Sequence, residues 1–130
     1  EVVDYRADPN WCDTISRLSN GGVDHVIDVG GSSTLGQSIN AVRVDGSLVL
    51  IGILGGLSAE INIGQLLMKQ QRIRPIAVGS RAMQLRMVEA IERSGMKPVI
   101  DARFPLGRLA DAFRHQLSGQ HFGKIVIDLD

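Results

Sequence analysis

The chain has 130 residues, of which 44% are hydrophobic, and its 14 basic residues balance its 14 acidic ones. This length and apolar content are enough for one domain with its own core. Because no basic run is present and the longest apolar stretch, residues 47–57, is far too short to cross a bilayer, we expect neither nucleic acid nor a membrane as a partner.

The first predicted elements are a strand end, a helix and a strand. Val2-Val3 predicts the tail of a strand, and Asp8-Pro9 has the pattern of an N-cap followed by proline at the first helical position. That helix is expected to run to about Leu18. Residues 23–29 then predict a strand, which Gly30-Gly31 interrupts.

The next segment predicts a helix, a turn and a second strand. Ser32 or Ser33 is the expected cap, and Leu35, Ile39 and Val42 fall at helical spacing on one face. A turn is predicted at Asp45-Gly46. Residues 47–53 form a nearly continuous aliphatic run, as expected when helices cover both faces of a sheet.

The second half of the chain continues the alternation of strands and helices. The predicted elements are a short strand at 61–63, a helix around 65–70, a strand at 73–78, a helix from about 82 to 94, an extended segment at 99–104, a helix with Leu109, Ala110, Phe113 and Leu117 as its buried stripe, and a strand at 124–129. Alternation of these lengths predicts the α/β class with a mainly parallel sheet.

Three successive strands end in small residues, at Val29-Gly30-Gly31, Ile51-Gly52-Ile53 and Val78-Gly79-Ser80. In an open parallel sheet, ligands bind beyond the carboxyl ends of the strands. Glycine at such a position lets a flat ring or a sugar approach the main chain closely. Each ending is also compatible with an ordinary turn, but three in succession favour a binding rim.

Five segments of the chain, taken in order, resemble the medium-chain dehydrogenase/reductase family. They are V-D-H-V-I-D-V-G-G, L-V-L-I-G, A-V-G-S-R-A-M, P-V-I-D-A-R-F-P-L and H-F-G-K-I-V-I-D. Within that family the zinc-type alcohol dehydrogenases and their quinone-reductase-like relatives are most similar. Order and spacing carry the resemblance, which extends from Val2 to Asp128. It implies a partial Rossmann-type fold in which residues 1–130 are the C-terminal portion of a nucleotide-binding domain, with 23–29, 47–53 and 73–78 as its strands four to six.

The resemblance also implies an oxidoreductase that uses NAD or NADP and transfers hydride between the nicotinamide and a small alcohol or carbonyl substrate. Val29, Gly30 and Gly31 would border a ribose of the cofactor. Ile51, Gly52 and Ile53 would offer backbone groups to the nicotinamide, and Val78, Gly79 and Ser80 to its carboxamide. Lys124 would lie near the phosphates and Tyr5 near the adenine ribose. Lys124 is equally compatible with a solvated strand start, and Tyr5 with packing on the sheet edge.

Several groups required for catalysis are missing from the sequence. No G-x-G-x-x-G fingerprint occurs, and His25, His115, His121 and the single cysteine, Cys12, show no metal-binding spacing. We interpret Asp28, inside an aliphatic strand, as a carboxylate hydrogen-bonded to nearby backbone. We therefore expect no catalytic residue and no metal ligand in this chain. The resemblance implies that an N-terminal part supplies the zinc site and the first βαβ unit. We expect this chain alone to be inactive.

Other functions remain open from the sequence. A zinc-free quinone or enone reductase of the same family is one alternative, and a non-catalytic nucleotide-binding or oligomerisation module is another. Family resemblance implies a homodimer or larger assembly joined through sheet edges, at 73–78 or 60–63, and a covered edge at 23–29. A lone cysteine is typical of a reducing compartment, so a cytoplasmic location is expected.

Overall fold

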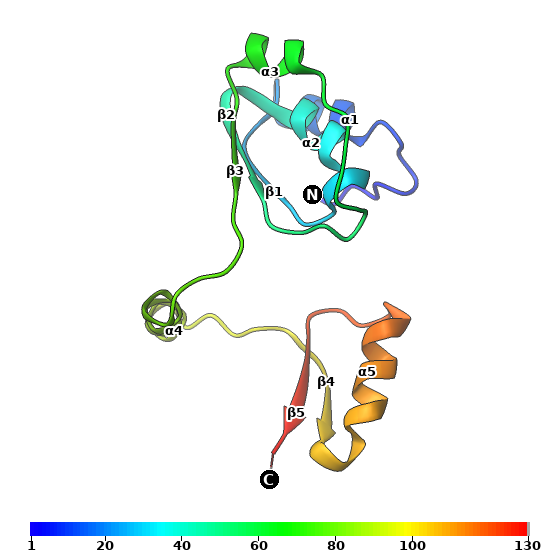
Figure 1. Cartoon of the computed structure of the whole chain (residues 1–130), viewed down its shortest axis with the longest axis vertical. Helices are drawn as coiled ribbons and strands as arrows, with labels where there is room; N and C mark the ends of the chain where they lie inside the picture. Colours follow the sequence, from blue (N-terminus) through cyan, green and yellow to red (C-terminus); the bar gives the residue numbers. More distant parts are fainter. Residues whose placement is uncertain (130) are drawn as a thin grey trace. The chain divides into compact units, whose positions relative to one another are not determined.

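The computed structural model describes residues 1–129, which form two compact units that divide after Val78 (Figure 1). The first unit comprises residues 1–78, and the second begins at Gly79. From the sequence we expected one domain over the whole chain. The two units are described separately below.

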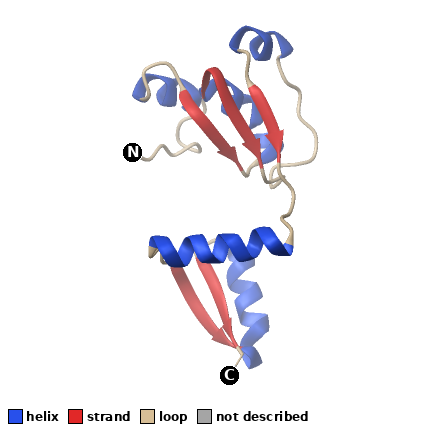
Figure 2. Ribbon diagram, turned by 90° about the vertical axis from the view of Figure 1, so that its left-hand side faces the viewer, coloured by secondary structure: helices blue, strands red, loops and turns tan. Residues whose placement is uncertain are grey.

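The first unit is built on a parallel three-stranded sheet. Its strands are β1 (Val23–Asp28), β2 (Val42–Leu50) and β3 (Arg72–Pro75), in the order β1-β2-β3. Figure 2 shows the three arrows side by side and pointing the same way. All three carboxyl ends therefore lie at one edge of the sheet, and the predicted α/β class with parallel strands is confirmed.

One face of this sheet is covered by helices. They are α1 (Trp11–Leu18), α2 (Leu35–Ala41) and α3 (Ile63–Lys69), with a 3-10 turn at Gly31–Ser33. Ile39, Val42 and Leu48 are the buried centre of the core. Partly buried side chains packed against that centre are Val26, Leu35, Leu50, Leu66 and Ile73. Leu35 and Ile39 thus pack on the core as predicted, whereas Val42, predicted on the same helix face, is the first residue of β2.

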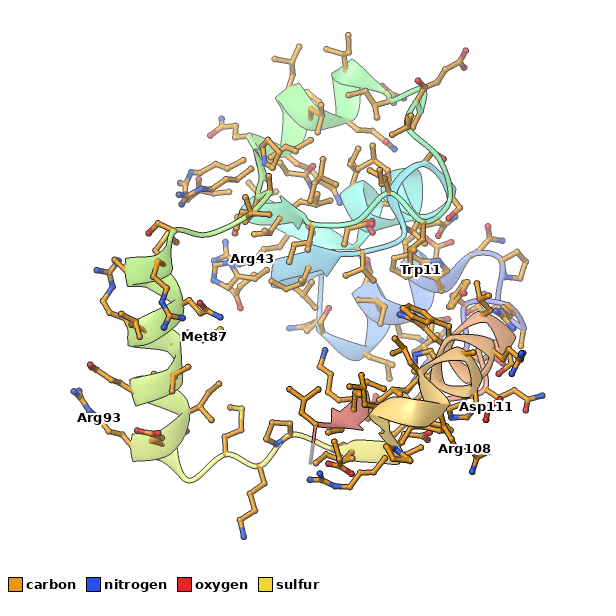
Figure 3. All side chains as sticks on the ribbon, turned by 60° about the horizontal axis from the view of Figure 1, so that its bottom comes forward. Trp11, Arg43, Met87, Arg93, Arg108 and Asp111 are labelled. Carbon is orange, nitrogen blue, oxygen red and sulfur yellow. The ribbon has the colours of Figure 1, made fainter. Side chains whose placement is uncertain are left out.

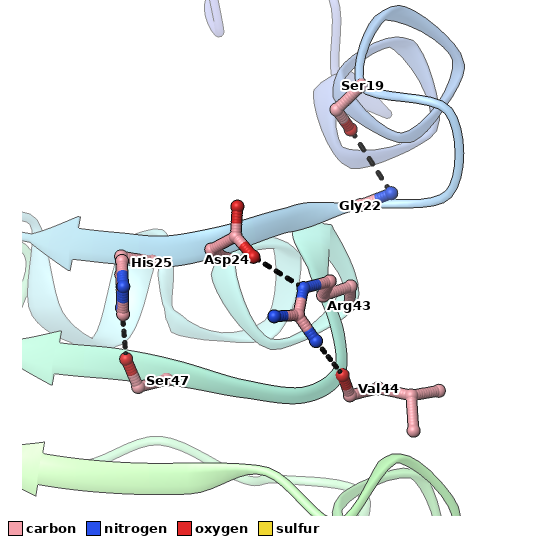
Figure 4. A network of polar contacts seen from close by, with 7 residues as sticks. All are labelled: Ser19, Gly22, Asp24, His25, Arg43, Val44 and Ser47. Atoms are coloured by element: carbon pink, nitrogen blue, oxygen red, sulfur yellow. Dashed lines mark hydrogen bonds and ion pairs between the residues drawn. The ribbon is translucent and has the colours of Figure 1, made fainter.

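Several polar side chains of β1 and β2 form exposed contacts with each other (Figure 4). His25 Nδ1 lies 2.5 Å from Ser47 Oγ, directly across the two strands. Arg43 Nε donates to Asp24 Oδ1 at 2.6 Å, and both side chains remain largely exposed. Within β1, Val26 packs against the core and Asp28 is buried, whereas His25 and Ile27 are exposed, as expected from the alternation of side chains along a strand.

Asp45-Gly46 forms a bulge inside β2, where we had predicted a turn before the strand. Val23 pairs with Val42, but His25 already pairs with Ser47, so β2 contains extra residues at this point. Asp45 adopts a left-handed conformation with φ of 57°. The turn-forming residues are correctly located, but parallel pairing with β1 continues on both sides of them.

Other predicted boundaries differ from the structure because of local contacts. Asn10, not Asp8, is the N-cap of α1: Asp8 Oδ2 accepts from the Thr14 hydroxyl at 2.7 Å and so fastens a turn that precedes the helix. Val2-Val3 lies outside any strand. Residues 61–63 do not form a strand, because the Asn62 side chain caps α3 by accepting from Gln65 N.

Two further predictions near the site were wrong. The expected caps Ser32 and Ser33 lie within the 3-10 turn, and α2 begins after Thr34. The strand predicted at 73–78 ends at Pro75, whose ring removes a backbone donor. Ile76 N still donates to Leu50 O at 2.8 Å, so the chain follows β2 one residue beyond the end of β3.

The second unit contains the long helix α4 (Arg81–Ser94), β4 (Ile100–Pro105), a 3-10 turn at Leu106–Arg108, α5 (Leu109–Ser118) and β5 (Lys124–Asp128). β4 and β5 pair in parallel, and α5 packs on them. Side chains such as Met87 and Arg93 project from α4 (Figure 3), and none of its residues is buried. In the part of the chain that the structure describes, every helix is too short or too polar to cross a membrane.

Candidate functional site

The three strand ends of the first unit line one cavity of about 390 Å³. Gly31 and Ser32 contribute from the segment after β1, residues 50–53 from the end of β2, and residues 75–77 from the end of β3. The remaining lining residues are Leu35, Gly56, Leu57, Ser58 and Ala59. The sequence predicted a trough shared by three strand ends, but with Val78, Gly79 and Ser80 as the third ending, and residues 75–77 line the cavity in their place.

The glycines at this edge serve a different purpose from the one we expected. A Cβ added to Gly52 would lie 2.0 Å from Val29 O, and one added to Gly31 would lie 2.9 Å from Ile53 Cα. Gly31 also has a positive φ of 73°. These glycines therefore allow the ends of β1 and β2 to pack on each other, and they do not leave open main chain for a ligand.

Most amide groups of the segment after β2 are already used within the protein. Ile51 N and Gly52 N both donate to Asp28 O, at 2.8 and 3.2 Å. Within residues 1–129, the amide of Ile53 donates to no protein group, and Ile53 is one of the residues that line the cavity. Of the three predicted residues, only Ile53 thus has an amide free for a ligand.

Asp28 closes β1 with a buried carboxylate that is 3% exposed. Its Oδ1 accepts from Gly31 N at 2.8 Å, and its Oδ2 accepts from the Ser38 hydroxyl at 2.6 Å. The Thr34 hydroxyl lies 2.9 Å from both oxygens. The sequence indicated a hydrogen-bonded carboxylate here, but it did not identify the two hydroxyl partners, which α2 brings back over the strand end.

A second cavity of about 680 Å³ lies on the other side of the segment that follows β1. Tyr5, Val29 and Gly30 line it, together with Arg6, Trp11, Asp28 and Leu54 among others. Tyr5 is 55% exposed, and the Arg6 guanidinium lies 5.8 Å from the centre of its ring. Tyr5 therefore forms part of the wall of this cavity, together with Val29 and Gly30.

The remaining predicted residues are placed elsewhere in the chain. Val78 is the last residue of the first unit and is 93% exposed, while Gly79 and Ser80 begin the second. Ser80 Oγ accepts from Met83 N at 3.3 Å and so caps α4. Lys124 starts β5 and lines a cavity of about 340 Å³ with Phe113 and His121. Within the first unit, the structure brings together the residues at 5, 29–31 and 51–53.

A pair that the sequence did not indicate joins two elements of the second unit. His115 Nε2 of α5 lies 2.6 Å from Asp101 Oδ2 of β4, and Phe122 N donates to Asp101 Oδ1 at 3.0 Å. The hydrogen bond from His115 lowers the pKa of Asp101, and that from Phe122 adds to the effect. Fourteen residues separate the partners, so neither helical nor strand periodicity predicts their contact.

Zinc does not fit the donor set of this chain. Among residues 1–129, no group of three or more histidine, cysteine, aspartate or glutamate side chains is arranged to hold a metal ion. Cys12 is buried in α1, and burial raises the pKa of its thiol. A thiol with a raised pKa is a poor metal ligand, because metals bind the thiolate.

Comparison with known proteins gives consistent matches. Residues 1–127 match the model of the family described as zinc-binding dehydrogenase. A zinc-type alcohol dehydrogenase-like protein of Schizosaccharomyces pombe is 38% identical over 99% of this chain, and a quinone oxidoreductase-like protein of Mus musculus is 27% identical over 90%. A solved structure of a candidate alcohol dehydrogenase from Sinorhizobium meliloti 1021 is 36% identical over 95% of the chain, with a TM-score of 0.85. This chain spans 39%, 36% and 36% of those three proteins, respectively.

Proposed function

The chain belongs to the zinc-binding dehydrogenase family, and on that premise we propose that it forms part of the cofactor site of an NAD(P)-dependent oxidoreductase. The observation that supports this most strongly is the shared cavity at the carboxyl ends of β1, β2 and β3. Open parallel sheets bind ligands at this edge. A bound nicotinamide would give or accept a hydride at an alcohol or carbonyl carbon.

This chain's own residues would hold the nicotinamide end of the cofactor. Ile53 lines the cavity wall, and its amide is a free donor, suited to a carboxamide oxygen. Leu35, Ile76 and Ala77 add apolar surface to the same wall. Apolar walls exclude water from a ring, while a few polar groups set its orientation.

The larger cavity would hold a ribose and the adenine. Tyr5 offers an aromatic face for a flat base, and Arg6 beside it carries the positive charge that a phosphate needs. A dinucleotide lying across Val29, Gly30 and Gly31 would reach both cavities, because this segment lines each of them.

Catalysis itself is assigned to residues outside this chain. The zinc of a zinc-type enzyme would need ligands that residues 1–129 do not supply. Under this proposal the whole protein transfers hydride, while this chain alone binds weakly and turns over no substrate. A small molecule, an alcohol or a carbonyl compound, would be the substrate partner.

The test is cofactor binding and turnover by the complete protein that carries this chain. Titration with NADH and NADPH, followed by fluorescence, should give saturable binding to at least one of them. Ile53→Pro, which removes the free amide, should weaken that binding, whereas Ile53→Val, which keeps the amide, should not. A protein that binds neither dinucleotide would contradict the proposal.

The alternative within the family is a zinc-free quinone or enone reductase, which the similarity to the mouse quinone oxidoreductase-like protein favours. Two measurements distinguish the zinc-type enzyme from the zinc-free reductase. The first is the zinc content of the purified protein. The second compares the rate at which quinones and enones oxidise NAD(P)H with the rate at which alcohols reduce NAD(P)⁺. Cofactor binding without turnover of either substrate class would instead support a non-catalytic nucleotide-binding module.

A further inference from the structure

We propose that Asp28 is a positioning residue of the candidate site, whose buried carboxylate orients the segment at residues 29–34 toward the cofactor. This inference rests on the proposed function, because it assigns a role in the same site. The inference goes beyond the proposed function because it assigns the conformation of residues 29–34 to a buried side chain next to that segment.

The Asp28 carboxylate accepts hydrogen bonds from three groups that belong to two segments of the chain. Gly31 N comes from the segment that crosses the strand end, and the hydroxyls of Thr34 and Ser38 come from the start and middle of α2. Gly31 has a positive φ, and its amide is directed inward to Asp28 Oδ1. The side chain therefore fixes both the conformation of Gly31 and the distance between α2 and β1.

The backbone carbonyl of Asp28 also holds the residues that follow β2. Asp28 O accepts from Ile51 N and Gly52 N, at the end of β2. On the other side of the rim, Gly55 N donates to Gly30 O at 2.6 Å. One residue thus connects the segments after β1 and β2, and Ile53, with its free amide, lies between these two attachment points.

A negative charge at this position would be costly if its only role were to fill space. Asp28 is 3% exposed, and no cation forms an ion pair with it in the described structure. Burying a carboxylate without a cation carries a large desolvation cost. A charged acceptor makes shorter and more directional hydrogen bonds than an amide, so what the carboxylate contributes is the orientation of its donors.

The geometry also indicates which property would change when the carboxylate is lost. Gly31 and Ser32 line the smaller cavity, whereas Val29, Gly30 and Thr34 line the larger one. A shift of this segment would disturb both cavities together. We therefore expect the affinity for the whole dinucleotide to fall, with a smaller effect on the rate of the bound complex.

The experiment compares two pairs of variants in the complete protein. Asp28→Asn removes the charge with little change of shape, and Asp24→Asn makes the same substitution at an exposed position of the same strand. Thr34→Val removes one donor to Asp28, and Thr34→Ser keeps that hydroxyl. Dissociation constants for NADH and NADPH, kcat and KM are measured, with amide hydrogen exchange at Gly31 as a readout of the segment.

Asp28→Asn should raise the dissociation constant of the preferred cofactor at least about tenfold, because a hydrogen bond to a charged group is lost. Thr34→Val should act in the same direction, exchange at Gly31 should become faster, and kcat should change less than the cofactor KM. Asp24→Asn should stay within about twofold of the parent protein, well below that loss, and Thr34→Ser should keep more of the affinity than Thr34→Val does.

Unchanged cofactor affinity in Asp28→Asn, in a parent protein that binds cofactor, would overturn the positioning role while the proposed function stands. A parent protein that binds neither dinucleotide overturns both. Where Asp28→Asn does not fold, the Thr34 pair decides: equal affinity in Thr34→Val and Thr34→Ser counts against the role.

Discussion

At the scale of single residues, Gly52 determines whether the ends of β1 and β2 can lie together. Its α-carbon faces Val29 O so closely that an added Cβ would lie 2.0 Å from that oxygen. The obstacle is backbone, which cannot rotate away as a side chain can. Gly36, in α2, has no atom within 4 Å of such a Cβ and provides a contrast.

Gly52→Ala is therefore expected to destabilise the first unit by about 1–3 kcal/mol through overpacking. The matched control Gly36→Ala should stabilise it by about 0.5–1 kcal/mol, since alanine restricts the unfolded chain and suits a helix. Urea denaturation of both variants measures the two free energies of unfolding. Equal stabilities would show that the strand ends separate at little cost.

Asp101 is a residue whose titration should change the stability of the second unit. Its folded-state pKa lies below the ordinary value, first because of the hydrogen bond from His115. A lowered pKa means that the stabilisation is present above the unfolded-state pKa of about 3.9 and is lost as the pH falls through the folded-state pKa.

Asp101→Asn should accordingly lower the melting temperature at neutral pH, and its difference from the parent should shrink as the pH falls below about 4. Thermal unfolding at a series of pH values measures this difference. Glu60→Gln serves as the control, because Glu60 makes no ion pair in the described structure and its difference should stay small throughout. A difference for Asp101→Asn that grows on acidification would contradict the assignment.

At the scale of elements, the C-terminal end of α2 is held by side chains from α3 and from the residue just before β3. Lys69 Nζ donates to Asn40 O at 2.7 Å and to Val42 O at 2.9 Å. Gln71 Nε2 donates to Ile39 O at 2.8 Å and to Val42 O at 3.1 Å. The last carbonyls of a helix lack intrahelical donors, and a cation there also interacts favourably with the helix dipole.

Lys69→Met should therefore cost about 1–2 kcal/mol of stability, because it keeps the aliphatic stem but removes a charged donor from two carbonyls. Lys97→Met is the matched control, since Lys97 is exposed in a loop of the second unit. Denaturant unfolding followed by circular dichroism gives both values. A loss that is the same for the two variants would indicate a general effect of charge and not of capping.

The predictions at element scale succeeded where local pattern was sufficient. The helices near 35–41, 82–94 and 109–117 follow from periodicity, which depends only on neighbours in the sequence. The buried stripe predicted for the last helix was wrong: Ala112 is the buried residue of α5, whereas the predicted residues, Leu109, Ala110, Phe113 and Leu117, are exposed. The start of α1 and the segment at 61–63 were wrong because single side chains, Asp8 and Asn62, form turns and caps that periodicity does not register.

At the scale of the whole molecule, the parallel sheet of the first unit has two edges. β1 and β3 each pair with β2 only, so each has one side without a strand in the described structure. Charged residues and Pro75 in β3, and its length of four residues, reduce unwanted pairing there. We propose that the complete protein self-associates through the free edge of β1 or of β3.

Sedimentation velocity of the complete protein over a range of concentrations should then give a dimer or a larger species. Buried apolar and backbone surface at a sheet edge drives this association, so moderate salt should leave it in place. A monomer at every concentration would rule out the proposed assembly. Cofactor affinity, measured in parallel, is expected to be independent of this result.

The amino-acid sequence by itself determined the α/β class, the family and most of the succession of elements, although the strands predicted at 2–3 and 61–63 are absent. These properties depend on short-range spacing and on order along the chain. Tertiary structure decided that Gly52 allows two backbones to pack on each other, that Asp28 meets Thr34 and Ser38, that Asp101 meets His115, and that the chain forms two units. Such contacts depend on strand register and on the path of the chain between elements, which local periodicity does not encode.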